Sequence, residues 1–275
     1  MLPSSRLSLA GGRLHVVVDG SEEPRPGHLR ALARITARVY VLQMPQGHHG
    51  LDWLMPIAGR MEELFVAGHE CEDLSALQHF TRLRSLSLVG RPHPQGPPLT
   101  HVADRLHEYG GPWFPALDPV LASPVLRDLM LEQPPRDLTA RLTAPLEHLR
   151  LLSARKLTTI PVLTCTDTLT SLEIAGGRDL DLTGVAAYTR LDRLDLYGRT
   201  PLTSFSELTR SPTLRRLFLE HCYAVDDIDA LKQLSLDELR IIGRPESLDP
   251  YFLSTARGLG VRKFSAPPGD TPRGS

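Results

Sequence analysis

The apolar residues of this chain follow one short pattern that recurs at a nearly constant spacing. The pattern is L-x-x-L-x-L, with Ile, Val or Met allowed in place of Leu, and its copies begin at Met61, Leu83, Leu126, Leu146, Leu169, Leu191, Leu214 and Leu236. Successive copies start 20 to 23 residues apart, except for one 43-residue step that is close to two periods. A fixed period of this length is typical of a protein built from stacked coils.

Each copy predicts one short strand and one tight return. The second and third apolar residues are two positions apart, which is the period of a β-strand, so both point inward and the residue between them points outward. Glycine follows several strands, as at Gly90, Gly176 and Gly198, and tolerates the positive φ that a sharp turn can require. The return segments, such as 73–77 and 227–231, are short, so single helical turns or 3₁₀ pieces are expected.

Weaker copies extend the array towards both ends. Residues 39–41 precede the matching residues 64–66 by 25, and residues 14–16 precede residues 39–41 by the same interval. Residues 261–266 follow the copy at Leu236 by 25. We therefore expect one continuous solenoid, because each coil can bury its leucines only against its neighbours.

The predicted solenoid covers residues 1–266, with its strongest repeats at 61–90 and 126–243. Residues 267–275 are rich in Pro and Gly and are predicted to form a disordered tail.

The proline-rich stretch 91–115 interrupts the regular pattern. Within it, residues 99–109 could form a helix with one apolar face. We interpret the stretch as one degenerate or enlarged repeat; a surface loop without a role is the alternative.

These repeats resemble the leucine-rich-repeat superfamily, nearest to its short 22-residue class, over roughly residues 30–266. The resemblance implies an α/β-type solenoid: a horseshoe with a parallel concave β-sheet and short helical, 3₁₀ or irregular convex segments. The family usually places Asn just after each strand, but this chain contains no asparagine. Looser or less regular turns are therefore expected.

The net charge and the composition limit the kinds of partner and the cellular location that we expect. The net charge is −1 at pH 7 and the pI is near 6.8, so neither nucleic acid nor an anionic membrane is expected as a partner. No apolar run reaches the length of a membrane-spanning helix.

Three widely spaced cysteines without Cys-rich caps favour a reducing, cytoplasmic setting. The absence of Asn and the scarcity of Lys indicate a GC-rich genome, and the resemblance is to bacterial-type sensor and interaction arrays.

The sequence offers no recognisable catalytic machinery. The His- and Cys-containing segments at 48–49, 69–72 and 221–222 lack the spacing of a zinc site. No G-x-x-x-x-G-K-[ST] loop accompanies the acidic strand end at Asp19, and no G-x-S-x-G motif occurs. We therefore expect no enzymatic activity, no metal and no small-molecule cofactor.

The outward strand positions form columns along the predicted sheet, and many of them are apolar or aromatic. An exposed apolar stripe edged by charges is a common mark of a protein-binding surface. The predicted protein-binding residues on the concave face are Tyr40, Phe65, Met130, Arg150, Leu152, Glu173, Asp195, Tyr197, Phe218, Glu220, Arg240 and Ile242.

The expected function is a protein-interaction scaffold or sensor that holds a protein or peptide on this concave face. The alternative is a regulatory or sensor subunit for a separately encoded NTPase, toxin or effector.

Overall fold

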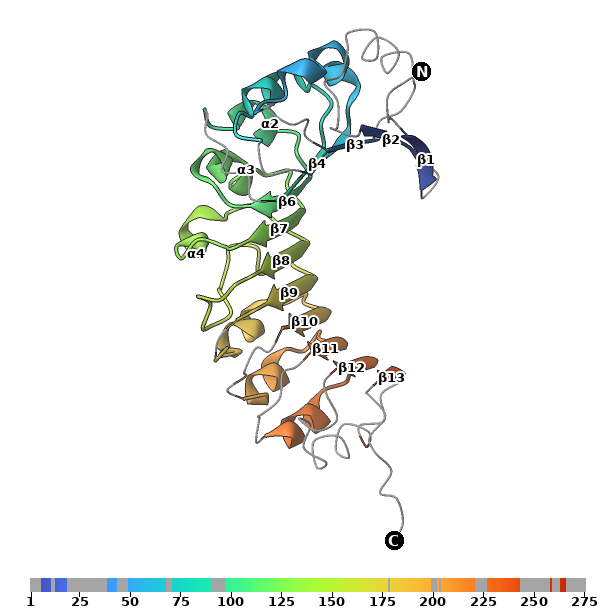
Figure 1. Cartoon of the computed structure of the whole chain (residues 1–275). Helices are drawn as coiled ribbons and strands as arrows, with labels where there is room; N and C mark the ends of the chain where they lie inside the picture. Colours follow the sequence, from blue (N-terminus) through green and yellow to red (C-terminus); the bar gives the residue numbers. More distant parts are fainter. Residues whose placement is uncertain are drawn as a thin grey trace. The chain divides into compact units, whose positions relative to one another are not determined.

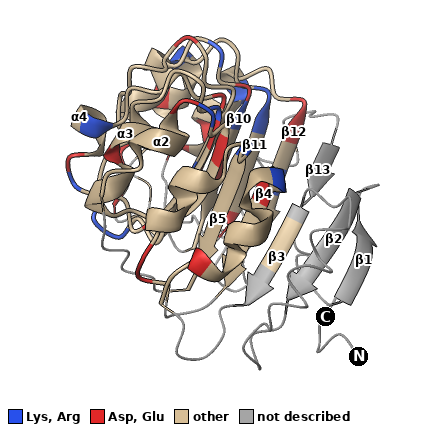
Figure 2. Ribbon diagram, turned by 90° about the horizontal axis from the view of Figure 1, so that it is seen from above, with Lys and Arg blue, Asp and Glu red and all other residues tan. Residues whose placement is uncertain are grey.

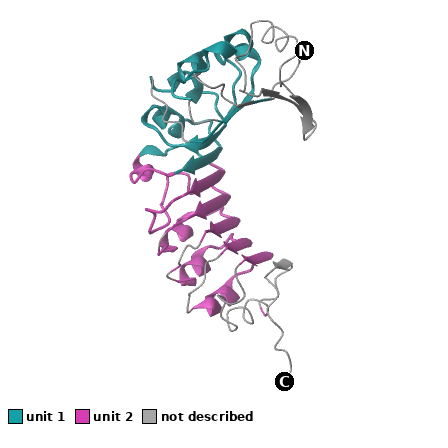
Figure 3. Ribbon diagram, viewed as in Figure 1, with its two compact units in different colours: residues 1–132, 141–145 teal, residues 133–140, 146–275 magenta. Residues whose placement is uncertain are grey.

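The structure is a computed structural model of the 275-residue chain. It describes residues 6–10, 13–18, 39–43, 49–67, 71–90, 97–177, 179–198, 202, 204–220, 227–242, 258 and 263–265. The chain divides into two compact units (Figure 3). Unit 1 comprises residues 1–132 and 141–145, and unit 2 comprises residues 133–140 and 146–275. The two units are described separately below.

The sheet of unit 1 follows the chain order (Figure 1). Its strands are β1 (Arg6–Ala10), β2 (Arg13–Val18), β3 (Val39–Gln43), β4 (Glu63–Ala67), β5 (Ser85–Val89), β6 (Glu108–Pro112) and β7 (Asp128–Glu132). Strand β1 pairs antiparallel with β2, and each later strand pairs parallel with the one before it. The return segments are η1 (Asp52–Arg60), η2 (Ser75–His79), α2 (Thr100–Ala103), η3 (Pro115–Leu117) and α3 (Asp118–Leu121).

Unit 2 repeats the same arrangement. Its strands are β8 (His148–Leu152), β9 (Ser171–Ala175), β10 (Arg193–Tyr197), β11 (Arg216–Glu220), β12 (Glu238–Ile242) and β13 (Lys263–Ser265), all paired in parallel. The return segments are η4 (Thr183–Ala187), η5 (Ser206–Arg210) and η6 (Ile228–Gln233), together with α4 (Leu138–Arg141), most of which falls in unit 2. The short 3₁₀ and helical returns confirm the sequence prediction.

The core lies between the strands and the return segments. In β10, for example, Leu194 and Leu196 are fully buried, and Leu191 of the same L-x-x-L-x-L copy is buried as well. Return segments supply the facing side chains, such as Val185 of η4 and Leu208 of η5. Parallel strands in register, with a leucine core shared between successive coils, give the chain the leucine-rich-repeat fold, which confirms the predicted fold class.

A repeated backbone bond fixes the register between successive coils. At the starts of β5–β7 and β9–β12, two consecutive N–H groups donate to one carbonyl of the preceding coil, as Asp192 and Arg193 do to Thr170 at 2.9 and 3.0 Å. The next coil repeats the contact, with Arg215 and Arg216 both donating to the carbonyl of Asp192. The same bond is kept although the coils differ in length by a few residues, so it fixes the register of the strands rather than the length of the coils.

The turns that follow the strands use positive φ, as predicted for the glycines. Gly176 and Gly198 have φ of 83° and 78°, while Ser153 and Gln133 occupy the corresponding turns with φ of 52° and 53°. Backbone hydrogen bonds tie these turns to the next coil: the N–H of Gly176 donates to the carbonyl of Tyr197 at 3.1 Å. Backbone bonding therefore holds turns that in the resembled family are held by asparagine side chains.

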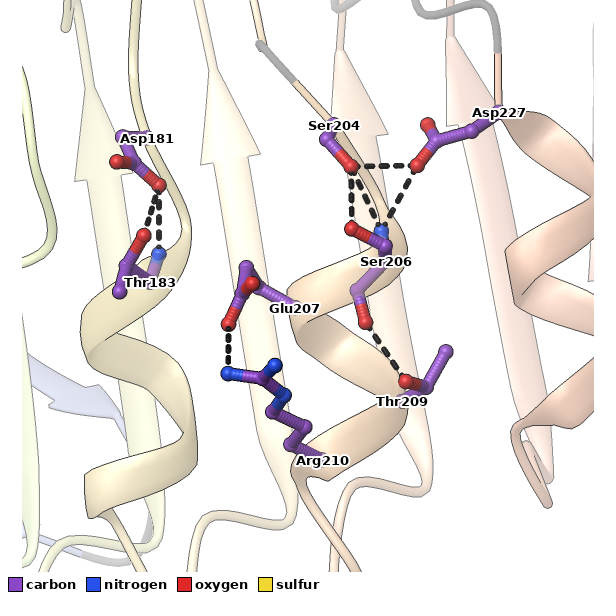
Figure 4. A network of polar contacts seen from close by, with 8 residues as sticks. All are labelled: Asp181, Thr183, Ser204, Ser206, Glu207, Thr209, Arg210 and Asp227. Atoms are coloured by element: carbon purple, nitrogen blue, oxygen red, sulfur yellow. Dashed lines mark hydrogen bonds and ion pairs between the residues drawn. The ribbon is translucent and has the colours of Figure 1, made fainter.

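Polar side chains hold the starts of the 3₁₀ segments in unit 2 (Figure 4). The carboxylate of Asp227 accepts hydrogen bonds from the hydroxyl of Ser204 and from the backbone N–H groups of Phe205 and Ser206. Burial opposes ionisation of Asp227, but these donors lower its pKa below the ordinary value. Asp181 accepts the N–H of Thr183 at 2.8 Å in the same manner.

Two sequence predictions in unit 1 are corrected. Tyr40 is fully buried and pairs in register with the inward Leu64, so the residue that shares a column with Phe65 is Val41. The sequence match of residues 39–41 to residues 64–66 is therefore one position out of register. Val-Tyr-Val contains no leucine, so its sequence does not show which residues point inward.

The predicted helix over residues 99–109 is also wrong in its extent. Helix α2 ends at Ala103, and Glu108–Pro112 instead forms β6, in register with β5 and β7. Residues 91–96 and the predicted disordered tail lie outside the described residues, and the prediction of one solenoid over residues 1–266 stays a prediction.

Candidate functional site: the open face of the sheet

The candidate site is the sheet face opposite the return segments, which the sequence predicted as concave. We define the unit 1 face as the outward positions of β4–β7 and the unit 2 face as the outward positions of β8–β12. The unit 1 face consists of Glu63, Phe65, Ala67, Ser85, Ser87, Val89, Glu108, Gly110, Pro112, Asp128, Met130 and Glu132. The unit 2 face consists of His148, Arg150, Leu152, Ser171, Glu173, Ala175, Arg193, Asp195, Tyr197, Arg216, Phe218, Glu220, Glu238, Arg240 and Ile242.

Exposed apolar side chains characterise the unit 1 face. Phe65 on β4 and Val89 on β5 are each 37 % exposed. The register places Phe65 opposite Ser87 and Ala67 opposite Val89, so Phe65 and Val89 are diagonal neighbours on adjacent strands. In the part of the chain that the structure describes, the other exposed large apolar side chains are Met55 and Val162, which lie outside the strands.

One of the central outward positions on this face, between β5 and β7, is a glycine. Gly110 on β6 lies between Ser87 and Met130 in register, and a Cβ built there would lie 3.0 Å from Met130 Cε and 3.3 Å from Ser87 Oγ. The Met130 methyl therefore occupies the space that a side chain at Gly110 would take. Because methionine is flexible, this part of the face can change shape with little strain.

The unit 1 face carries carboxylates and no Lys or Arg. Glu63, Glu108 and Asp128 begin their strands, and Glu132 ends β7. Together with burial, the carboxylate of Glu132 raises the pKa of the buried Tyr109 well above its ordinary value. The charged side chains of this face are therefore all acidic, and most of them lie where the strands begin.

An internal ion pair dominates the unit 2 face. Asp195 is only 3 % exposed although it occupies an outward position. Arg193, two residues earlier on β10, donates from Nε to both carboxylate oxygens at 2.9 and 2.8 Å, and its Nη2 lies 2.6 Å from Oδ2. The hydrogen bonds and the charge of Asp195 raise the pKa of Arg193 above its ordinary value.

Aromatic rings continue this cluster across β10, β11 and β12. The rings of Tyr197 and Phe218 lie 4.7 Å apart between centroids with a 39° tilt, and the Arg240 guanidinium lies 5.0 Å from the centroid of Phe218. The Tyr197 hydroxyl donates to Asp195 Oδ2 at 3.4 Å. Burial, followed by the charges of Asp195 and Glu173, raises the pKa of Tyr197 to about 12.

A second ion pair joins Arg216 of the unit 2 face to Asp192, the residue just before β10. Arg216 on β11 donates from Nε to the Asp192 carboxylate at 2.8 Å. Each of β10, β11 and β12 carries one basic and one acidic residue, coloured blue and red in Figure 2. The two faces therefore differ: the unit 2 face carries both signs of charge, whereas the charged side chains of the unit 1 face are all acidic.

Most of the predicted binding residues occupy outward positions. Those at outward positions and at least partly exposed are Phe65, Met130, Arg150, Leu152, Glu173, Tyr197, Glu220, Arg240 and Ile242. Asp195 and Phe218 also point outward, but their neighbours bury them, at 3 % and 9 % exposure. Tyr40 points into the core.

The prediction omitted Arg193, Glu108 and Val89 from the site. A basic residue two positions before an outward Asp on the same strand is a signal that would have revealed Arg193.

The described residues contain no group of three or more His, Cys, Asp or Glu side chains arranged to hold a metal ion. No helix within the same residues has the length and apolar character needed to cross a membrane.

Comparison with known proteins yields structural matches alone. Neither a protein-family model nor a curated protein sequence matches the chain. An internalin of Listeria monocytogenes is similar at 16 % identity and a TM-score of 0.49, with 92 % of this chain and 86 % of that one covered. A Leptospira interrogans LRR protein is similar at 15 % identity and a TM-score of 0.47, with coverage of 87 % and 62 %. The LRR ectodomain of an Arabidopsis thaliana receptor kinase, GASSHO1/SCHENGEN3, is similar at 19 % identity and a TM-score of 0.43, with coverage of 80 % and 28 %.

Proposed function

We propose that the chain is a non-enzymatic scaffold or sensor that binds a partner protein or peptide on the open face of its sheet. The observation that carries the proposal is the position of Phe65 and Val89, exposed on adjacent strands where no return segment covers them. Exposed apolar side chains gathered on one face and edged by charges are characteristic of protein-binding surfaces.

The unit 2 face supports the proposal through its chemistry. Aromatic residues and arginine are the usual energetic anchors of protein interfaces, and Tyr197, Phe218 and Arg240 stack on one another there. Their mutual contacts fix the side chains before a partner arrives, which lowers the entropy cost of binding.

The proposal is tested by capturing partners from the source-cell lysate and comparing face variants with a matched control. The face variants are Phe65→Asp with Val89→Asp for unit 1, and Tyr197→Asp with Arg240→Glu for unit 2. The control is Met55→Asp with Val162→Asp, which changes exposed apolar residues outside the strands. Circular dichroism first establishes that each variant is folded.

We expect a specific partner to bind the wild type and the control and to be lost from at least one face variant. Partners that bind all four proteins equally would contradict the proposal. The regulatory-subunit hypothesis uses the same surface and differs in the partner, so the identity of the captured protein, an NTPase, a toxin or neither, separates the two hypotheses.

We further propose that the protein works in a reducing, cytoplasmic setting, because its three cysteines are widely spaced and no Cys-rich caps accompany them. Cys71 and Cys165 are free and buried, and burial, followed by the charge of Asp73, raises the pKa of Cys71 to about 12. A thiol held in this state has little thiolate and acts as a small apolar core residue.

A further inference from the structure

We propose that the unit 1 face binds a polypeptide segment that carries both aliphatic and basic side chains. This inference rests on the proposed function and adds the chemistry of the partner. The outward positions of β4–β7 offer exposed apolar side chains at Phe65 and Val89, carboxylates at the starts of β4, β6 and β7, and one further carboxylate, Glu132, at the end of β7.

The carboxylates of the unit 1 face determine which charge a bound segment should carry. Glu63 and Asp128 already take part in other interactions, so the argument depends on Glu108 and Glu132, which are exposed and partly exposed. The nearby basic residues precede the strands rather than lie on them. One of these, Arg127, donates to the carbonyls of Pro124 and Leu126. A basic segment is therefore attracted to the margins of this face, and an acidic one is repelled.

The shape of the face also favours a side chain of moderate size. Gly110 leaves the central column without a Cβ, and the Met130 methyl fills the space at 3.0 Å from where that Cβ would lie. Because the methionine can move aside, an aliphatic side chain of the partner can enter between Phe65 and Met130. The unit 2 face lacks this combination, since its outward positions carry arginines as well as carboxylates, and Arg193 pairs with Asp195 there.

The test measures the binding of three fluorescent peptides to the full chain by anisotropy. The first peptide alternates lysine with leucine, the second alternates glutamate with leucine, and the third alternates lysine with serine. The inference predicts that the lysine–leucine peptide binds most tightly, and that raising the salt concentration to about 0.5 M weakens its binding. Tightest binding by the glutamate–leucine peptide, equal binding by all three, or no binding of the lysine–leucine peptide would overturn the inference.

Two pairs of variants locate the site. Glu108→Lys with Glu132→Lys is expected to weaken binding of the lysine–leucine peptide roughly tenfold. Glu72→Lys with Asp104→Lys, at exposed positions outside the strands, makes the same change in net charge and is expected to leave binding nearly unchanged. Phe65→Ser is expected to weaken binding, whereas Met55→Ser, at a side chain 40 % exposed in η1, is not.

The variants also separate this inference from the proposed function. If the acidic peptide binds best and Phe65→Ser abolishes its binding, the open face binds polypeptides but the proposed charge preference is wrong. If lysine–leucine binding is as strong in Glu108→Lys with Glu132→Lys and in Phe65→Ser as in the wild type, the unit 1 face is not the site, and this inference fails. The capture experiment then decides independently whether the unit 2 face carries the proposed function.

Discussion

Arg193 holds the buried carboxylate of Asp195 on the open face of β10, with its Nε donating to both carboxylate oxygens at 2.9 and 2.8 Å. The two residues are two positions apart on one strand, so their side chains lie on the same face of the sheet. This pair orders the centre of the unit 2 face, because Asp195 also accepts the hydroxyl of Tyr197.

Removing the arginine is expected to leave a buried charge without its ion-pair partner. Arg193→Ala should lower the free energy of unfolding by about 1–2 kcal/mol, because Asp195 is buried while Arg193 itself is partly in water. Arg193→Lys should recover part of this loss, since an ammonium group cannot make the forked contact. Urea unfolding measures the effect, with the exposed Arg190→Ala as control, expected to change stability by less than about 0.5 kcal/mol. A loss from Arg190→Ala as large as that from Arg193→Ala would contradict this account.

Tyrosine ionisation is expected to make the protein less stable in alkali. Burial raises the pKa of Tyr197 to about 12, and the pKa of Tyr109, Tyr188 and Tyr40 is raised as well. Between pH 10 and these values the unfolded chain has lost protons that the folded protein keeps. The tyrosine contribution to stability is therefore fully present below about pH 10 and is lost as the pH rises further.

Urea unfolding at a series of alkaline pH values measures this loss. Asp195→Asn should lower the pKa of Tyr197, because it removes a neighbouring negative charge. Ultraviolet titration of the phenolate band, with Tyr197→Phe as reference, follows that one residue. An unchanged Tyr197 titration in Asp195→Asn would contradict the electrostatic explanation.

Substitutions to and from glycine test how much the positive φ costs in the turns that follow the strands. Ser153 has a φ of 52°, a conformation that costs an L-residue about 1 kcal/mol, so Ser153→Gly should preserve or raise the stability of unit 2. The reverse change at the equivalent turn, Gly198→Ala at φ 78°, should lower the free energy of unfolding by about 1 kcal/mol. Denaturant midpoints measure both variants. Destabilisation by Ser153→Gly that equals that of Gly198→Ala would show that backbone strain is not the controlling factor.

A close approach of two coils makes one glycine sensitive to substitution. A Cβ built at Gly184 in η4 would overlap the carbonyl oxygen of Ile160 in the preceding coil. Gly184→Ala should therefore lower the free energy of unfolding by about 2 kcal/mol or more. Gly59→Ala in η1 is the control, because a Cβ there would meet only Thr81 Oγ1 at an ordinary 3.9 Å. Thermal unfolding that is equal in the two variants would contradict the packing described here.

The leucine spacing predicted the strands and returns wherever a leucine marks the inward position. It failed at Tyr40, where the flanking valines fit either register, and at β6, where Tyr109 and Gly111 occupy the two inward positions in place of leucine. Burial on the open face was harder to predict. Asp195 occupies an outward position, yet Arg193 and Tyr197 cover it, and such contacts depend on side-chain geometry that a periodic pattern does not encode.

The central claim, that the open sheet face binds a partner, is tested most directly by photo-crosslinking from two exposed apolar positions. A photoreactive residue replaces Val89 on β5 in one protein and Val162, outside the strands, in the other; these side chains are 37 % and 55 % exposed. Both proteins are irradiated in the source cells, and the adducts are identified by mass. The account predicts a discrete adduct to one partner from position 89 and none to that partner from position 162. A discrete adduct from position 162 alone would contradict it.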